Sequence, residues 1–139
     1  MSSGANDYNT QVIEEFRTNH GKVGGFFADA DMLILHTTGA RTGKERVNPL
    51  VYLPEDGSLV VFASKGGAPT NPDWYHNLLA HPHVTIEVGD ETKPAVARVT
   101  TGEERERLFA EQVRRRPAFG EYQAKTTRQI PVIMLTPED

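Results

Sequence analysis

The sequence predicts a mainly β protein with helices, of the α+β class, in which about six antiparallel strands form a small barrel. Two observations favour this class. Short apolar or alternating segments of strand length recur from residue 32 to 135, and tight turns at Asp56-Gly57 and Gly89-Asp90 link two pairs of them. Antiparallel strands joined by such hairpins commonly close into a barrel whose gaps are covered by helices. With 139 residues the chain is long enough for one such domain with a sizeable core.

Residues 1–30 are expected to form a tail and one short amphipathic helix, ahead of a barrel domain over 31–139. The helix is expected over 8–19, after a loose tail at 1–7, because apolar residues there recur at helical spacing: Tyr8, Val12, Ile13 and Phe16. The glycines that follow end it. The pattern leaves open whether this helix contacts a membrane surface, a partner subunit or the barrel.

Three strands are expected in the first half of the barrel, at 32–37, 47–53 and 59–63. Pro49 lies within the second of them and cannot donate a ladder hydrogen bond, so this strand is expected at a sheet edge or at a bulge. Asp56-Gly57 is a hairpin turn between the second and third strands. A regular hairpin would bring Arg46, before one strand, close to Lys65, after the other.

A polar loop at 64–71 leads into a helix, for which Asn71 is expected as the N-cap and Pro72 as the first helical residue. That helix is expected to end at about Ala80, before Pro82. Strands at 83–88 and 95–100 then pair around the Gly89-Asp90 turn.

The C-terminal part is expected to hold a helix of about 14 residues that opens at Thr101-Gly102-Glu103-Glu104 and ends at Arg116-Pro117. Its inward face carries Leu108, Phe109 and Val113. A loop with Phe119, Tyr122 and Gln123 is expected to follow, before a last strand at 130–135.

Composition excludes several classes of function. The chain contains no cysteine, which excludes disulfides and thiolate chemistry and is consistent with a cytoplasmic protein. No apolar run is long enough to span a bilayer, and the first residues lack the features of a signal peptide. A net charge of −4 argues against general nucleic-acid binding. Peripheral contact with a membrane stays open.

Cations gather at the two ends of one predicted hairpin. Arg41, Lys44 and Arg46 follow Gly39, while Lys65 precedes Gly66-Gly67. The first turn is not a Walker loop, because the glycines are too closely spaced and Glu45 follows the lysine. Glycine-rich backbone can still nest a phosphate, and a net-acidic protein that concentrates cations suits a discrete small anion. The alternative is a plain hairpin turn with ordinary surface cations.

Other candidate residues have competing interpretations. The helix after Asn71 points its partially positive N-terminus toward the same region, and Trp74 is either a core residue or a wall beside a planar ring. Phe119 and Tyr122 either cover the core or roof a flat substrate. His76, His81 and His83 have no metal-ligand spacing, so no metal site is expected. The order of residues shows no Ser-His-Asp triad and no nucleophile elbow.

Three stretches resemble the deazaflavin-dependent nitroreductases, also described as quinone reductases. These stretches read TTGARTGKERVNPLVY, ASKGGAPTNPDWYHNLLAHPHV and FGEYQAKTTRQIPVIML, and together they span about residues 33–137. The resemblance implies a split β-barrel like that of flavin-mononucleotide (FMN) oxidoreductases. It also implies hydride transfer from reduced coenzyme F-420, an 8-hydroxy-5-deazaflavin, to a small-molecule acceptor.

The same resemblance implies a set of cofactor contacts. The phosphate and acidic tail are expected against Arg41, Lys44 and Arg46, with backbone donors at Thr42 and Gly43, and the ring pocket against Pro49 and Val51. Further contacts are expected from Ala63, Ser64, Lys65, Gly66 and Gly67. The mouth would be closed by Asn71, Trp74 and Asn77.

For the acceptor side, Phe119 and Tyr122 match aromatic positions near the substrate, and Ser64 or Tyr122 could donate a hydrogen bond or a proton. Two departures from the family pattern matter. Ala40 replaces a cation that some members carry, which should weaken tail binding. Val51 and Phe119 replace tyrosines of nitroimidazole-reducing members, so quinone or enone reduction is the better expectation.

Two other functions stay open on the sequence alone. One is an FMN-dependent oxidoreductase on the same barrel, and the other is a non-catalytic module that binds a cofactor or lipid. A monomer and a homodimer are both compatible with the pattern.

Overall fold

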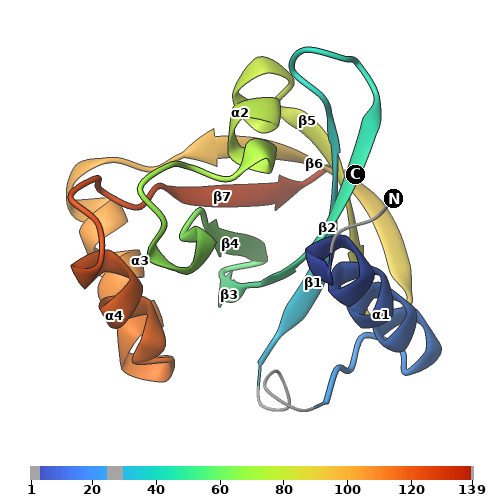
Figure 1. Cartoon of the computed structure of the whole chain (residues 1–139), viewed down its shortest axis with the longest axis horizontal. Helices are drawn as coiled ribbons and strands as arrows, with labels where there is room; N and C mark the ends of the chain where they lie inside the picture. Colours follow the sequence, from blue (N-terminus) through green and yellow to red (C-terminus); the bar gives the residue numbers. More distant parts are fainter. Residues whose placement is uncertain (1–3, 25–29, 139) are drawn as a thin grey trace.

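The computed structural model describes residues 4–24 and 30–138, which form one curled antiparallel sheet with helices around it (Figure 1). In chain order the elements are α1 (Gly4–Thr18), β1 (Met32–Thr38), β2 (Glu45–Val51), β3 (Leu53–Glu55), β4 (Ser58–Phe62), the short 3₁₀ helix η2 (Lys65–Gly67), α2 (Asp73–Ala80), β5 (His83–Val88), β6 (Glu91–Val99), α3 (Gly102–Arg115), α4 (Ala118–Ala124) and β7 (Val132–Pro137). The mainly β, barrel-like class is confirmed.

The sheet has seven strands in the order β2-β1-β5-β6-β7-β4-β3, so β2 and β3 form its two opposite edges. Only Tyr52 separates these two strands in the sequence, and its N–H donates to the carbonyl of Asp31 at 2.8 Å. Because one continuous segment belongs to both edges, the sheet must curl until the edges meet at this point. The barrel stays split at the other end, where β2 begins and β4 ends.

The predicted strand at 47–53 is therefore wrong as a single unit. Its first part, β2, pairs with β1, in the register Met32 with Val51, and only Leu53–Glu55 pairs with β4 as the expected hairpin. Pro49 does lie in an edge strand, as predicted. An edge strand has a neighbour on one side only, so the missing N–H of proline is tolerated there.

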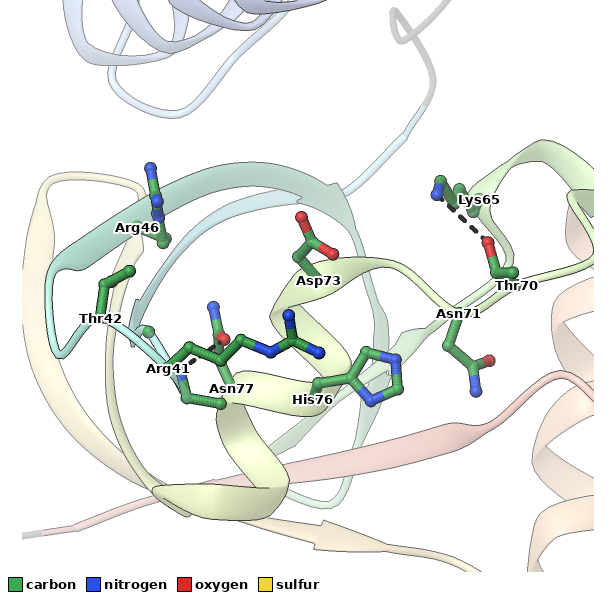
Figure 2. A pocket seen from close by; sticks show the side chains of 11 residues that line it. Arg41, Thr42, Arg46, Lys65, Thr70, Asn71, Asp73, His76 and Asn77 are labelled. Carbon is green, nitrogen blue, oxygen red and sulfur yellow. Dashed lines mark hydrogen bonds between the residues drawn. The ribbon is translucent and has the colours of Figure 1, made fainter.

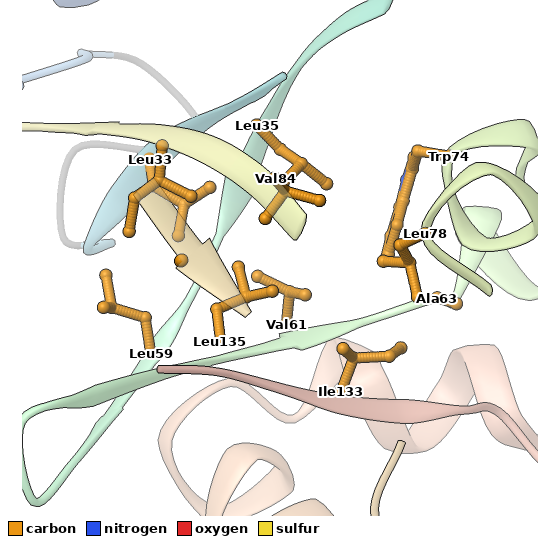
Figure 3. Close-up of a cluster of buried hydrophobic side chains, with 12 residues drawn as sticks. Leu33, Leu35, Leu59, Val61, Ala63, Trp74, Leu78, Val84, Ile133 and Leu135 are labelled. Carbon is orange, nitrogen blue, oxygen red and sulfur yellow. The ribbon is translucent and has the colours of Figure 1, made fainter. Parts of the chain in front are cut away.

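Three apolar clusters hold the sheet and the helices together. The barrel interior contains residues from most strands and is closed at one end by Trp74 and Leu78 of α2 (Figure 3). A second cluster lies between the sheet and helices α3 and α4. A third lies between α1 and the outer face of β1 and β2. Met32–Leu35 is apolar at every position because β1 is covered on both faces.

The helices differ from the prediction at three places. α1 begins at Gly4 within the expected tail, of which residues 1–3 lie outside the described part of the chain. α2 begins at Asp73 with Pro72 at the N-cap, one residue later than expected, because the side chain of Asn71 is bonded elsewhere. The segment that carries Phe119 and Tyr122 is the helix α4 rather than a loop.

The predicted helix over about 14 residues from Gly102 is confirmed as α3. The strand at 83–88 is also confirmed, whereas the next strand is longer than predicted and begins at Glu91. None of the helices in the described residues has the length and apolar character needed to cross a membrane.

Candidate functional site

The first part of the site is the turn between β1 and β2, which carries Arg41. The N–H of Gly39 donates to the carbonyl of Lys44 at 2.8 Å, and the N–H of Gly43 donates to the carbonyl of Gly39 at 2.9 Å. Gly43 has a φ of 70°, a conformation that favours glycine. The N–H of Gly43 is thus already bonded within the turn, so it is not free to donate to a ligand as expected.

Asn77 of α2 fastens this turn to the barrel. Its Oδ1 accepts from the N–H of Ala40 at 2.9 Å, and its Nδ2 donates to Oγ1 of Thr37 at 3.1 Å. The side chain of Asn77 is buried, and so is Thr37. Because buried polar groups need partners, one amide side chain holds the backbone just before Arg41 in place.

The second part of the site is the loop after β4, in which three consecutive residues have left-handed backbone. The φ values of Lys65, Gly66 and Gly67 are 48°, 63° and 87°. Such a conformation costs a non-glycine residue about 1–2 kcal/mol, so Lys65 is held there by its surroundings. Gly67 is buried against α4, where an added Cβ would lie 2.8 Å from the carbonyl oxygen of Tyr122.

Arg128 supports this loop, and the sequence analysis did not single it out. Its guanidinium donates to the carbonyls of Ala63, Ser64 and Ala68 at 3.1, 2.9 and 3.0 Å, and to Oδ1 of Asn71 at 2.7 Å. Burial lowers the pKa of Arg128 from its ordinary value, since desolvation disfavours the charged form. In sequence Arg128 is one of 15 lysines and arginines, with no neighbouring pattern that marks it.

The turn and the loop face each other across a cavity of about 650 Å³. Figure 2 shows the guanidinium of Arg41 directed into the space between the turn and α2, while Lys65 lies on the opposite side beside Thr70. Arg46, Asn71 and Asn77 also line this cavity. Arg46 and Lys65 thus line one cavity together with Arg41, although the curl of the sheet brings them there rather than the expected hairpin. Lys44, expected beside them, is not among the described residues that line this cavity, and binding of a ligand by these cations stays a prediction.

A second cavity of about 610 Å³ lies between α1, the start of β2 and α2. Four residues line both cavities: Arg46, Lys65, Asp73 and Asn77. The second cavity adds apolar walls from Ile13, Val47 and Trp74. The two spaces thus share a wall that carries two cations, one carboxylate and one amide. Both cavities have a largely polar lining, and the second differs by its added apolar walls.

Several predicted site residues lie away from these cavities. Val51 packs under α1 in the third cluster, and neither it nor Pro49 is among the described residues that line the two cavities. Phe119 is buried in the second cluster, where its ring lies 5.6 Å from that of Phe62 and 5.2 Å from that of Tyr122. α4 contacts the loop of the site at Gly67.

Four further predicted contacts are not among the described residues that line either cavity. Ala63 is buried in the barrel core, Ser64 is half-buried, and Lys44 and Gly66 are exposed. Thr42 lines the first cavity, and its Oγ1 accepts from the N–H of Lys44 at 3.2 Å.

Ion pairs fix α1, which forms one wall of the second cavity. Arg17 donates to both carboxylate oxygens of Glu87 on β5, at 3.0 and 2.6 Å. His36 lies between Glu87, at 2.6 Å from Nε2, and Glu45, at 3.0 Å from Nδ1. The hydrogen bond from Arg17, together with that from His36, lowers the pKa of Glu87 below its usual value. Within the described residues, no group of three or more histidine, aspartate or glutamate side chains could hold a metal ion.

Comparison with known proteins identifies the family. The family model described as F420H(2)-dependent quinone reductase matches residues 9–137, which is nearly the whole chain. The chain belongs to this family. It is 35% identical over 125 residues to the F420H(2)-dependent quinone reductase Rv1261c of Mycobacterium tuberculosis, covering 87% of this chain and 84% of that protein. It is also 36% identical over 113 residues to a putative F420H(2)-dependent quinone reductase of the same species, Rv3178, covering 81% and 95%.

Solved structures show the same fold within and beyond the quinone reductase family. The F420-H2 dependent reductase FDR-A is 43% identical and superposes with a TM-score of 0.69, over 75% of this chain and 92% of that chain. A protein described as a domain-swapped dimer is 38% identical, with a TM-score of 0.71 and coverage of 94% and 96%. HutZ, a heme storage protein from Vibrio cholerae, is 19% identical with a TM-score of 0.60 over 94% and 91%, and shares the fold alone.

Proposed function

We propose that this protein is an oxidoreductase that transfers a hydride from reduced coenzyme F-420 to a quinone. The observation that carries the proposal is the meeting of Arg41, Arg46 and Lys65 around one cavity in a chain whose net charge is −4. Membership of the F420H(2)-dependent quinone reductase family supports both the cofactor and the acceptor class.

The residues present fit a flat molecule with an acidic tail. Arg41, Arg46 and Lys65 would hold the tail and phosphate, because opposite charges in a partly enclosed site attract more strongly than in water. Ile13 and Trp74 offer an apolar wall for a ring in the second cavity. When bound, the reduced deazaflavin supplies the hydride. The expected ring contacts of Pro49 and Val51 stay a prediction.

The protein's own contribution is to bind, orient and stabilise charge. A quinone that accepts a hydride and a proton carries negative charge on one oxygen before the proton arrives. A hydroxyl aimed at that oxygen stabilises the charge. Ser64 and Tyr122 are the proposed candidates: both are half-buried, Ser64 directly precedes η2, and the backbone of Tyr122 contacts Gly67 of η2. Quinones and enones are the proposed acceptors, and nitro-aromatic compounds are secondary ones.

A homodimer is the proposed assembly. The support is the 38%-identical solved structure that is described as a domain-swapped dimer. Size-exclusion chromatography with light scattering gives the mass directly, and a single species at 15.4 kDa would contradict this assembly.

The test of the reaction is a single-turnover experiment in which reduced coenzyme F-420 and protein are mixed with menadione. We expect the cofactor to be oxidised in proportion to protein. Arg41→Ala should require more cofactor for saturation, whereas Lys22→Ala, an exposed cation outside both cavities, should behave like the wild type. Binding of the cofactor without oxidation would indicate a carrier, and the proposal would then be wrong.

The same assay tests the hydroxyl donors. We expect Ser64→Ala or Tyr122→Phe to slow hydride transfer about tenfold or more at saturating cofactor, because a lost oxyanion donor acts on the chemical step. Unchanged rates in both variants would show that neither hydroxyl is needed to stabilise the acceptor, and this assignment would be wrong.

A further inference from the structure

Arg128 is the strongest unassigned feature near the site. It lies between α4 and β7 and reaches back to the loop 63–71, where its guanidinium makes the four hydrogen bonds given above. Its recorded acceptors are three carbonyl oxygens and one amide oxygen, all uncharged. These partners do not neutralise the positive charge of Arg128. The loop 63–71 is therefore next to two positive charges, that of Arg128 and that of its own Lys65.

The loop that Arg128 holds supplies one side of the first cavity. Lys65, Thr70 and Asn71 line this cavity (Figure 2). The side chain of Asn71 also accepts a hydrogen bond from Arg128. Inside the loop, Lys65 Nζ contacts Oγ1 of Thr70 at 3.4 Å, which is at the long end for a hydrogen bond. Within the loop, three residues have left-handed backbone, and two backbone hydrogen bonds join Gly67 to Ser64 and Ala68 to Lys65. The four hydrogen bonds from Arg128 are therefore a large part of what holds this loop in place.

We infer that Arg128 is the positioning residue of the cationic loop 63–71, and that it sets the affinity of the cavity for the anionic tail of the cofactor. The inference rests on the proposed function and names a residue that acts through Lys65 and Asn71 rather than on the ligand itself. A guanidinium suits this task because its planar, rigid set of donors reaches several acceptors at once. A lysine at the same place would keep the charge but lose that geometry.

Arg105 provides a matched control. It is also a buried arginine that bonds a backbone carbonyl, donating to Ile130 at 2.7 Å, and it stacks over Phe109 at 4.5 Å. Its other side-chain partners are Glu106 and Gln123, and it lines neither cavity. Gln123 also donates to the backbone carbonyl of Arg128 at 2.7 Å, but the bonds of Arg105 reach neither the guanidinium of Arg128 nor the loop 63–71. Substitution of Arg105 should therefore lower stability without changing the cationic loop.

The experiment compares wild type, Arg128→Lys, Arg128→Gln and Arg105→Lys by fluorescence titration with coenzyme F-420. We expect both Arg128 variants to raise the dissociation constant about tenfold, which corresponds to about 1.4 kcal/mol, while kcat at saturating cofactor and the KM for menadione stay within about twofold because the chemical step is untouched. Arg105→Lys should lower Tm and leave the dissociation constant unchanged.

A second readout uses the ligand-free protein. The N–H groups of Gly67 and Ala68 donate to the carbonyls of Ser64 and Lys65 at 2.9 and 3.1 Å. Their amide hydrogen exchange should become faster in Arg128→Lys and stay unchanged in Arg105→Lys, since exchange reports local opening.

Three outcomes would overturn the inference: wild-type affinity in both Arg128 variants, wild-type affinity in Arg128→Lys alone, which would leave only a charge effect, or unchanged exchange at Gly67 and Ala68. If wild type binds no coenzyme F-420 while Arg128→Lys still exchanges faster at this loop, the proposed cofactor is wrong and the positioning of the loop by Arg128 stands.

Discussion

Replacement of Asn77 by alanine should both destabilise the protein and weaken cofactor binding. The change removes the acceptor of the Ala40 N–H and the donor to Thr37, at 2.9 and 3.1 Å, and both bonds are buried or partly buried. A buried polar group left without a partner costs about 1–3 kcal/mol, so two of them give about 2–4 kcal/mol after some access to water. At about 2.1 cal/mol/K per residue, unfolding entropy converts that loss to a fall in Tm of about 7–14 °C.

Urea denaturation and thermal unfolding measure the stability, and fluorescence titration measures the affinity for coenzyme F-420. Asn77→Asp is the informative partner variant. Its carboxylate keeps an acceptor for the Ala40 N–H and can accept from the hydroxyl of Thr37. Burial of its charge is costly and the cations that line the cavity offset only part of that cost, so this variant should also be less stable than wild type. It also adds a negative charge to a cation-lined cavity, so binding of the anionic cofactor should still fall.

The reasoning about Asn77 is refuted if the alanine variant unfolds at the wild-type urea concentration. It is also refuted if Asn77→Asp binds the cofactor as tightly as wild type. The first result would show that the turn before Arg41 does not depend on this amide. The second would show that the negative charge of the cofactor does not bind near Asn77 in this cavity.

Three further predictions concern the loop, the α1 ion pairs and the shared wall. Gly67→Ala should cost about 2–3 kcal/mol in urea denaturation, because a left-handed residue gains a clash, whereas Gly66→Ala, with open space around its Cβ, should cost about 1 kcal/mol. The hydrogen bond from Arg17 lowers the pKa of Glu87, so the stability that this carboxylate contributes is present above about pH 4.5 and is lost as the pH falls through the lowered pKa. Below pH 4.5 the urea midpoint should therefore fall more steeply in wild type than in Glu87→Gln. Parallel curves for the two proteins would contradict this. Asp73 lines the first cavity, so Asp73→Asn should bind coenzyme F-420 about threefold more tightly at low salt. Titration should show a smaller gain at high salt, because salt screens the charge. Equal affinities of wild type and variant would show that the charge of Asp73 does not act on the cofactor.

Local patterns predicted most elements of the fold, because each depends on nearby residues. The helix at 102–115 was visible from its caps and apolar face, and the strand at 83–88 from alternation. The division of 47–53 at Tyr52 was not visible. β2 and β3 are contiguous in sequence but lie at opposite edges of the curled sheet. Local residue preferences do not determine that β2 pairs with β1 while β3 pairs with β4.

The cationic residues of the site could be predicted because charge and glycine stand out in a net-acidic chain. Arg41, Arg46 and Lys65 line one cavity. The regular hairpin that was expected to bring Arg46 close to Lys65 does not form, because β2 pairs with β1. The support of the site could not be predicted. Arg128 lies 57 residues from its partner Asn71, and Asn77 lies 37 residues from Ala40, so both depend on long-range folding.

The aromatic residues show a different limit. Phe119 and Tyr122 were expected in a loop over the substrate, but they lie on α4, with Phe119 packed in a core cluster. Aromatic residues serve cores and ligand sites equally well, and their type alone does not separate these uses. Their predicted contact with the acceptor stays a prediction.

The most direct test of the central claim is a fluorescence titration of the protein with coenzyme F-420 beside FMN, each at two salt concentrations. A cavity built on Arg41, Arg46 and Lys65 predicts saturable binding of coenzyme F-420, tighter than that of FMN and weaker at the higher salt concentration. Tighter binding of FMN, or an affinity for coenzyme F-420 that does not change with salt, would contradict it.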